Sequence, residues 1–203
     1  LHNLWANDCL PADPWRAIAE SGFDGVFGPD FSVWENGPRL EHLIESKRSV
    51  IAAAAIAGCG TPSTPNIFPF RDIDIARFAQ WIGEQPSLTT LSTNTQCCSH
   101  SNSHMKASAE RFARLCSAVG RPLQLVVVGL VQPDHVRTFA DSGFRIVVVN
   151  SRAYHGSRDR REYLLENGRI RCRPVVGNDR AALYRRNAHL LETIYAEILE
   201  PYG

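Results

Sequence analysis

The fold is decided by residues 123–158, which read LQLVVVGLVQPDHVRTFADSGFRIVVVNSRAYHGSR. Residues 123–128, apart from Gln124, and residues 146–149 are apolar runs rich in valine, and residues 134–142 between them have the length of a short helix, closed by Gly143. Continuous apolar strands joined through a helix are typical of a parallel β-α-β unit that is covered on both faces. The stretch therefore predicts a parallel α/β architecture.

The second strand of this unit runs into a polar and cationic segment, residues 150–158, which we interpret as a loop. Open α/β sheets and α/β barrels place their ligands at the carboxyl ends of parallel strands. We therefore expect the functional site where this strand ends.

An internal similarity favours a repeated architecture. Residues 19–32, AESGFDGVFGPDFS, and residues 140–152, ADSGFRIVVVNSR, share the order helix end, Ser-Gly-Phe, strand and polar loop. Counting all candidates gives about six or seven β-α units, which is near the lower size limit of a (β/α)₈ barrel. We predict one α/β domain over residues 1–203, built of parallel β-α repeats as a small or incomplete TIM-like barrel. The alternative is a doubly wound open sheet.

The remaining elements are assigned from their patterns. Residues 161–166 are interpreted as a short helix stopped by Asn167-Gly168, and residues 170–176 alternate apolar residues with arginine, as a half-exposed strand does. Residues 180–199 are predicted to form a last helix. Residues 39–57 have helical periodicity in Leu40, Leu43, Ile44 and Ile51.

Charge is balanced overall but uneven along the chain. The 22 Lys and Arg against 21 Asp and Glu give a formal net charge of +1, so there is no global attraction to nucleic acid or membrane. Arginine greatly outnumbers lysine and is concentrated between residues 152 and 186. Guanidinium groups suit phosphate and carboxylate, so we expect an anionic ligand. The alternative is a solvated surface of salt bridges.

The cysteines and the apolar runs bear on location. The 6 cysteines are scattered, and an even count does not imply disulfides in a chain of this length, so we expect a reducing cytoplasm. No run reaches transmembrane length, and no signal peptide is visible, so no membrane partner is predicted. The chain begins at Leu1 rather than at a methionine, which leaves open that it is a fragment with residues upstream.

Polar side chains follow several of the predicted strands, and parallel strands bring their carboxyl ends to one edge of a sheet. Asp30 is the candidate for acid-base or covalent chemistry, and His155 can exchange protons near neutral pH. The alternatives are that Asp30 or Ser32 only caps its loop, and that His155 is an ordinary exposed residue. The candidate substrate-binding residues are Ser32, Asn94, Gln96, Asn150, Arg152 and Arg158.

The segment CCSHSNSH, residues 97–104, contains zinc-type ligands in Cys97, Cys98, His100 and His104. Adjacent cysteines are poorly spaced for one tetrahedral ion, and there is no second cysteine pair. We therefore interpret the segment as a polar loop that opens a helix, predict no metal site, and leave the cofactor unknown.

One short motif carries a family resemblance. GPDFSVW, residues 28–34, resembles the SPDFS-plus-aromatic motif of an uncharacterised family of bacterial, phage and plasmid proteins, in which a later strand also gives way to a glycine- and arginine-containing loop, comparable to residues 154–161. The resemblance implies a setting in mobile elements and supplies no reaction. The order of β-α units is also distantly similar to tRNA-guanine transglycosylase barrels. That similarity makes Asp30 the matching carboxylate, but their zinc pattern is not reproduced.

These observations support one leading hypothesis and two alternatives. The leading hypothesis is an enzyme that acts on a nucleotide, a nucleic-acid base or another phosphorylated or anionic substrate at the carboxyl ends of the strands. The first alternative is a non-catalytic module that binds nucleic acid or protein through the C-terminal arginines. The second is a metal-dependent hydrolase with ligands from residues 97–104 together with Asp30.

Overall fold

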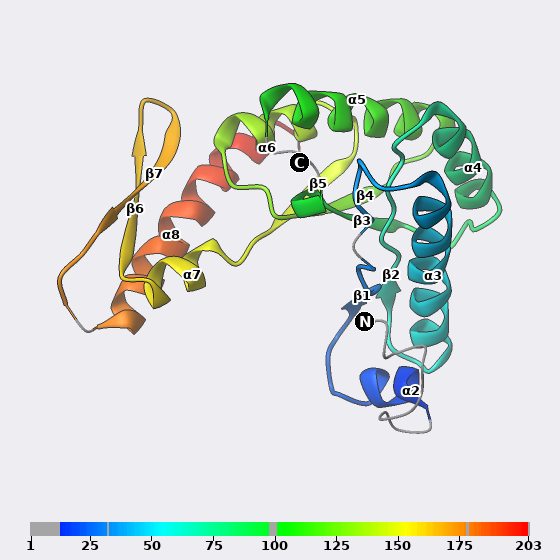
Figure 1. Ribbon diagram of the computed structural model, residues 1–203, viewed down its shortest axis with the longest axis horizontal. Helices are drawn as coiled ribbons and strands as arrows, with labels where there is room; N and C mark the ends of the chain where they lie inside the picture. Colours follow the sequence, from blue (N-terminus) through cyan, green and yellow to red (C-terminus); the bar gives the residue numbers. More distant parts are fainter. Residues whose placement is uncertain (1–12, 32, 98–100, 178, 203) are drawn as a thin grey trace.

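A computed structural model describes residues 13–31, 33–97, 101–177 and 179–202. At its centre is a three-stranded parallel sheet whose strands follow one another in chain order (Figure 1). These strands are β3 (Thr90–Asn94), β4 (Gln124–Val128) and β5 (Arg145–Val149). A second parallel pair is formed by β1 (Val26–Phe27) and β2 (Ser63–Thr64), and a parallel bridge from Asn66 to Ser92 joins the chain after β2 to β3.

Helices connect the successive strands. They are α3 (Arg39–Gly58) after β1, α4 (Asp72–Gly83) after β2, α5 (Asn102–Val119) after β3 and its 3-10 turn, and α6 (Pro133–Ala140) after β4, with α2 (Pro14–Ala19) before β1. The predicted α/β class with parallel strands is therefore confirmed. None of the helices in the described ranges combines the length and the apolar character needed to cross a membrane.

The strands do not close into a barrel within the described residues. After β5 the chain forms α7 (Arg152–Arg158), then the antiparallel hairpin of β6 (Arg161–Glu166) and β7 (Arg169–Pro174), and finally α8 (Arg180–Leu199). A closed barrel would need further parallel strands here. The doubly wound alternative needs a reversal of strand order, whereas β3, β4 and β5 are adjacent in chain order.

Two sequence interpretations of this C-terminal part are wrong. Residues 161–166 form strand β6 and not a helix, because Asn167 and Gly168 both have positive φ, of 51° and 73°, and make the tight turn of a hairpin. Residues 152–158 form helix α7 and not a loop. Figure 1 shows the hairpin projecting beside α8, away from the parallel sheet.

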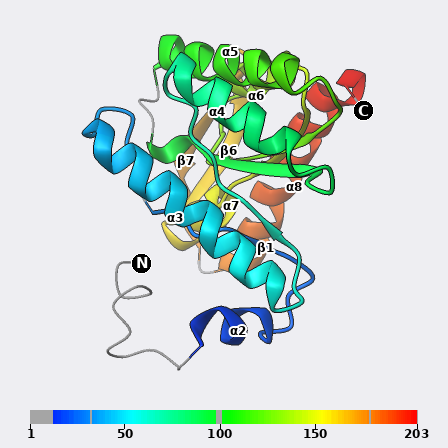
Figure 2. The same cartoon turned by 90° about the vertical axis from the view of Figure 1, so that its right-hand side faces the viewer.

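The main core lies between the parallel sheet and the helices that cover it. Figure 2 shows α4 and α5 lying over the sheet. Leu91, Leu125 and Val127 are fully buried on the helix side of the strands, where Phe112 of α5 packs on Phe139 of α6 with ring centroids 6.1 Å apart. Burial beneath the crossover helices thus explains the apolar character of β4, whereas β5 is an edge strand whose Val147 is 36% exposed.

Helix α3 is oriented differently from what its apolar periodicity suggests. Its buried side carries His42, Ser49, two alanines and Ile56, while Leu40, Leu43, Ile44 and Ile51 are 39–68% exposed. The reason is close approach: a Cβ on Gly28 would lie 3.1 Å from the Cβ of Ala53, so only small residues fit at the point where Gly28 meets α3. Leu40, Leu43, Ile44 and Ile51 therefore form an outward-facing stripe on α3.

Candidate functional site

A cavity of about 450 Å³ opens at the carboxyl ends of β4 and β5, and we call it the carboxyl-end cavity. Its walls come from the turn after β3, the start of α5, the turn after β4 with the first turn of α6, and the turn after β5 with α7. The lining residues are Gln96, Met105, Gly129, Val131, Gln132, His135, Asn150, Ser151, Arg152 and His155. This is the edge of the sheet at which the sequence predicts a site.

Gly129 sets the shape of the turn after β4. Its φ is +93°, and a Cβ at this position would lie 2.8 Å from Cγ of Gln96. The Gly129 N–H donates to the carbonyl of Val149, 2.8 Å away, and so continues the pairing of β4 with β5. Only glycine combines this left-handed backbone with so close a neighbour, so Gln96 is held at the mouth of the cavity.

Gln132 ties the cavity wall to the hairpin. Its Nε2 donates to the carbonyl of Ile170 (3.3 Å), and its Oε1 accepts from the Ile170 N–H (3.1 Å). The side-chain amide thus pairs with β7 as a neighbouring strand would. We call this pair of hydrogen bonds the Gln132 clamp.

Asn150 fixes the start of α7. Its Nδ2 donates to the carbonyl of Leu130 and to the hydroxyl of Tyr195, both at 3.2 Å, and its Oδ1 accepts from the Arg152 N–H at 3.1 Å. Both amide protons are therefore used by the protein itself. Asn150, which the sequence predicts to bind substrate, is placed to position Arg152.

Tyr195 is the buried anchor of this arrangement. Its hydroxyl donates to the carbonyl of Val131 (2.9 Å) while it accepts from Asn150, and only 8% of the residue is exposed. Burial raises the pKa of Tyr195 to about 12, although the hydrogen bond from Asn150 acts in the opposite direction. A phenolate could not donate to Val131, so the fold requires the protonated form.

The raised pKa predicts how stability changes at alkaline pH. The pKa of Tyr195 in the folded protein is about 12, against an ordinary value of 10.0. The contribution of Tyr195 to the free energy of unfolding is therefore complete below pH 10 and is lost between pH 10 and 12. The contribution is about 2–3 kcal/mol. The difference in unfolding free energy between the wild type and Tyr195→Phe should shrink over this range. Subtracting the ultraviolet absorbance of Tyr195→Phe from that of the wild type at each pH isolates the ionisation of Tyr195, which should have its midpoint near pH 12. A midpoint near pH 10 would contradict the assignment.

The cavity is electropositive. Arg152 contributes a guanidinium, His135 and His155 contribute imidazoles, and no aspartate or glutamate of the described chain lines it. His135 Nε2 contacts Oδ1 of Asn102 at 2.9 Å, which fixes its ring at the start of α6. Within the described ranges Arg152 forms no ion pair, so its charge is left for a ligand.

The predicted residues Asp30, Asn94 and Gln96 lie in one hydrogen-bonded chain. Asn94 Nδ2 donates to the carboxylate of Asp30, and Asn94 Oδ1 accepts from the Gln96 N–H at 2.9 Å. Of the three, only Gln96 lines the cavity. Asp30 therefore does not line the cavity, and Asn94 links it to Gln96, which does.

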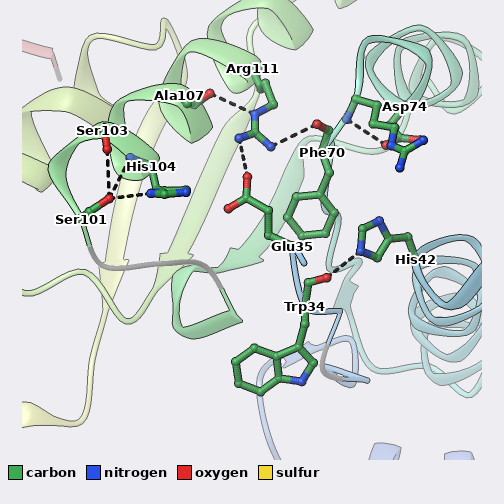
Figure 3. Close-up of polar contacts among 11 residues, drawn as sticks. Trp34, Glu35, His42, Phe70, Asp74, Ser101, Ser103, His104, Ala107 and Arg111 are labelled. Carbon is green, nitrogen blue, oxygen red and sulfur yellow. Dashed lines mark hydrogen bonds and ion pairs between the residues drawn. The ribbon is translucent and has the colours of Figure 1, made fainter. Parts of the chain in front are cut away.

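A largely buried ion pair supports the loop that carries Asp30. Arg111 of α5 donates to Glu35 (2.7 Å) and to the carbonyl of Phe70 (3.2 Å), and His42 Nε2 lies 2.6 Å from the carbonyl oxygen of Trp34 (Figure 3). The loop after β1 is thereby attached to both α5 and α3. The Trp34 indole itself is 53% exposed.

The other predicted residues lie elsewhere. Arg158 is outside the cavity at the end of α7, where it pairs with Asp159 at 2.9 Å and lowers the pKa of that carboxyl. Ser32, Cys98 and His100 fall outside the described residues. His104 contacts the hydroxyl of Ser101, which caps α5 by accepting from the His104 N–H (Figure 3). The described residues contain no cluster of three or more metal-ligating side chains.

Sequence reasoning did not single out His135, Ser151 or Tyr195. A signal existed for His135, because Pro133 at the first position of α6 places residue 135 in the first turn, directly after a predicted strand. No local signal marked Tyr195, which reaches Asn150 across a separation of 45 residues.

No protein-family model, curated protein or solved structure matches this chain. The resemblances of residues 28–34 and of the β-α order stay predictions.

Proposed function

We propose that the carboxyl-end cavity binds a phosphorylated or otherwise anionic small molecule, such as a nucleotide, and that the protein is an enzyme acting on it. The observation that carries the proposal is the lining itself, in which Arg152, His135 and His155 meet with no described carboxylate to neutralise them. Clefts of this size with a few convergent polar groups are the usual form of a small-molecule site.

Each group has a role that its chemistry supports. Arg152 would hold the anion through its guanidinium fork, with Asn150 setting its position. His155 would donate or accept a proton, and Asp30, which lies outside the cavity lining, would position Gln96 through Asn94. The free thiols of Cys59, Cys116 and Cys172 agree with a cytoplasmic location, where phosphorylated substrates are abundant.

Isothermal titration with adenosine monophosphate and with inorganic pyrophosphate tests the site. We expect saturable binding that Arg152→Gln weakens about tenfold or more, since a hydrogen bond to a charged group contributes about 1.5–3 kcal/mol. Arg158→Gln, in the same helix but paired with Asp159 outside the cavity, is the matched control. If neither ligand binds, or if Arg152→Gln binds like the wild type, the proposal fails.

A binding module for nucleic acid is the second candidate, and the position of the arginines favours it. Arg169, Arg171 and Arg173 alternate along β7 on one exposed face of the hairpin, and Arg173 pairs with Glu162 of β6. Arg169 and Arg171 have no ion pair within the described chain. Salt-sensitive binding of single-stranded DNA that is lost in Arg169→Gln/Arg171→Gln, with no ligand in the cavity, would decide for this candidate.

A further inference from the structure

A second cavity, of about 220 Å³, lies between α3 and α4, and it shares no lining residue with the carboxyl-end cavity. Figure 2 shows the two helices next to one another on the outside of the molecule. The walls are largely apolar, with Leu43 and Val50 from α3, Phe78 and Trp81 from α4, and Phe68 from the segment before α4. We call this space the α3–α4 cavity.

The charges around this cavity do not cancel. Arg39 and Asp74 pair with each other through two hydrogen bonds, and among the described residues Asp74 is the only carboxylate in the lining. Lys47 of α3 and Arg77 of α4 also line the cavity, and neither has an ion pair among the residues that the structure describes. Two cations on opposite walls are therefore left to meet an anion.

A buried imidazole adds a polar group to the lining. His42 is 4% exposed, and because the Trp34 carbonyl can only accept, Nε2 must donate to it. In the neutral ring Nδ1 is then an acceptor, and it has no hydrogen-bond partner within the described residues. Figure 3 shows His42 with one ring nitrogen directed at Trp34 and the other directed away from it. An unsatisfied buried acceptor is costly, and a ligand with an O–H or N–H group can satisfy it.

We propose that the α3–α4 cavity is a binding site for a compact aromatic carboxylate that also bears a hydroxyl or N–H group. The ring lies among Phe68, Phe78 and Trp81, where an apolar cavity of this size accepts an aromatic molecule in place of water. The carboxylate meets Lys47 and Arg77, and the hydrogen-bond donor reaches His42 Nδ1. The site is independent of the function proposed for the carboxyl-end cavity.

The test uses 4-hydroxyphenylacetate and the whole chain, by isothermal titration. We expect one site per chain, and affinity that falls about tenfold or more in Lys47→Gln/Arg77→Gln, because two charge-assisted contacts are lost. The control, Lys106→Gln/Arg185→Gln, removes the same charges from exposed positions on α5 and α8. 4-Methylphenol, which lacks the carboxylate, should bind at least about tenfold more weakly than the acid. Binding should also change tryptophan fluorescence in the wild type but not in Trp81→Phe.

Three results would overturn the proposal. The first is the absence of saturable binding, and the second is equal affinity for 4-methylphenol or for the Lys47→Gln/Arg77→Gln variant. The third is a dimer of the wild type in sedimentation that Ile44→Asp converts to monomer, because the cavity and the adjoining stripe of α3 would then be covered by a second copy of the chain.

Discussion

Replacing Asp74 with alanine is expected to lower the free energy of unfolding by about 3–5 kcal/mol. Asp74 is 5% exposed, and its carboxylate pairs with the guanidinium of Arg39 and accepts the Arg71 N–H at 3.0 Å to close the first turn of α4. Its removal leaves Arg39, whose side chain is 24% exposed, partly buried without a counter-charge, and removes the cap of α4. Urea unfolding followed by circular dichroism measures the loss.

An exposed ion pair provides the control for Asp74. Asp134 pairs with Arg137 on α6 with both side chains more than half exposed, so Asp134→Ala should cost no more than about 0.5 kcal/mol. In a double-mutant cycle, Arg39→Ala and Asp74→Ala should be strongly non-additive, because each removes the same interaction. Additive losses, or equal losses for Asp74→Ala and Asp134→Ala, would show that the buried pair does not hold α3 to α4.

The second large effect is expected for Asn187→Ala in α8. Asn187 is fully buried, its Oδ1 accepts the Tyr163 N–H (2.9 Å), and its Nδ2 donates to the carbonyl of Arg161 (2.9 Å). Alanine would leave the buried Tyr163 N–H and the partly buried Arg161 carbonyl of β6 without these partners, at about 1–3 kcal/mol each. We expect a loss of about 3–5 kcal/mol in the free energy of unfolding.

Hydrogen exchange can localise this effect to one amide. In Asn187→Ala the Tyr163 amide should lose protection while the amides of β4 keep theirs, because β6 is attached to α8 and not to the parallel sheet. Arg185→Ala, a substitution at an exposed position in the same helix, should change the free energy of unfolding and the exchange free energy of the Tyr163 amide by no more than about 0.5 kcal/mol each. Unchanged protection of Tyr163 would mean that another group takes over the contact.

The sequence predicts the parallel half of the fold well because its signals there are local. Uninterrupted valine-rich runs indicate strands of a parallel sheet, and they place β4 and β5 within one or two residues, although β5 is an edge strand whose Val147 is 36% exposed. The last helix begins at Arg180 and ends at Leu199, as its pattern and following proline indicate. Closure of the sheet was beyond prediction, because it depends on which distant segments meet and not on the character of any one strand.

The errors have equally specific causes. Asn167-Gly168 stops a helix and turns a hairpin equally well, and only the register of Glu166 against Arg169 decides between them. The apolar periodicity of α3 is correct, but Gly28 and Ala53 require the small side of that helix to face the sheet. Periodicity alone does not distinguish a face that packs inside the domain from one that remains exposed.

The candidate site was predictable to the extent that it follows from strand ends. Gln96, Asn150, Arg152 and His155 line or support one cavity because parallel strands end at one edge. Arg158 does not join them because α7 is a helix. His155 lies about 60° around the helix axis from Arg152, whereas Arg158 lies about 120° from Arg152 and about 9 Å farther along the axis, at the last residue of α7.

Through the Gln132 clamp, one side chain belongs to both the hairpin contact and the cavity wall. One amide both forms part of the cavity wall and holds the backbone of Ile170, so β7 cannot slide or lift without changing the wall. Any ligand that bound the arginine face of β7 and shifted the hairpin would therefore alter affinity in the cavity. By thermodynamic linkage the cavity ligand would then change binding at the hairpin by the same factor.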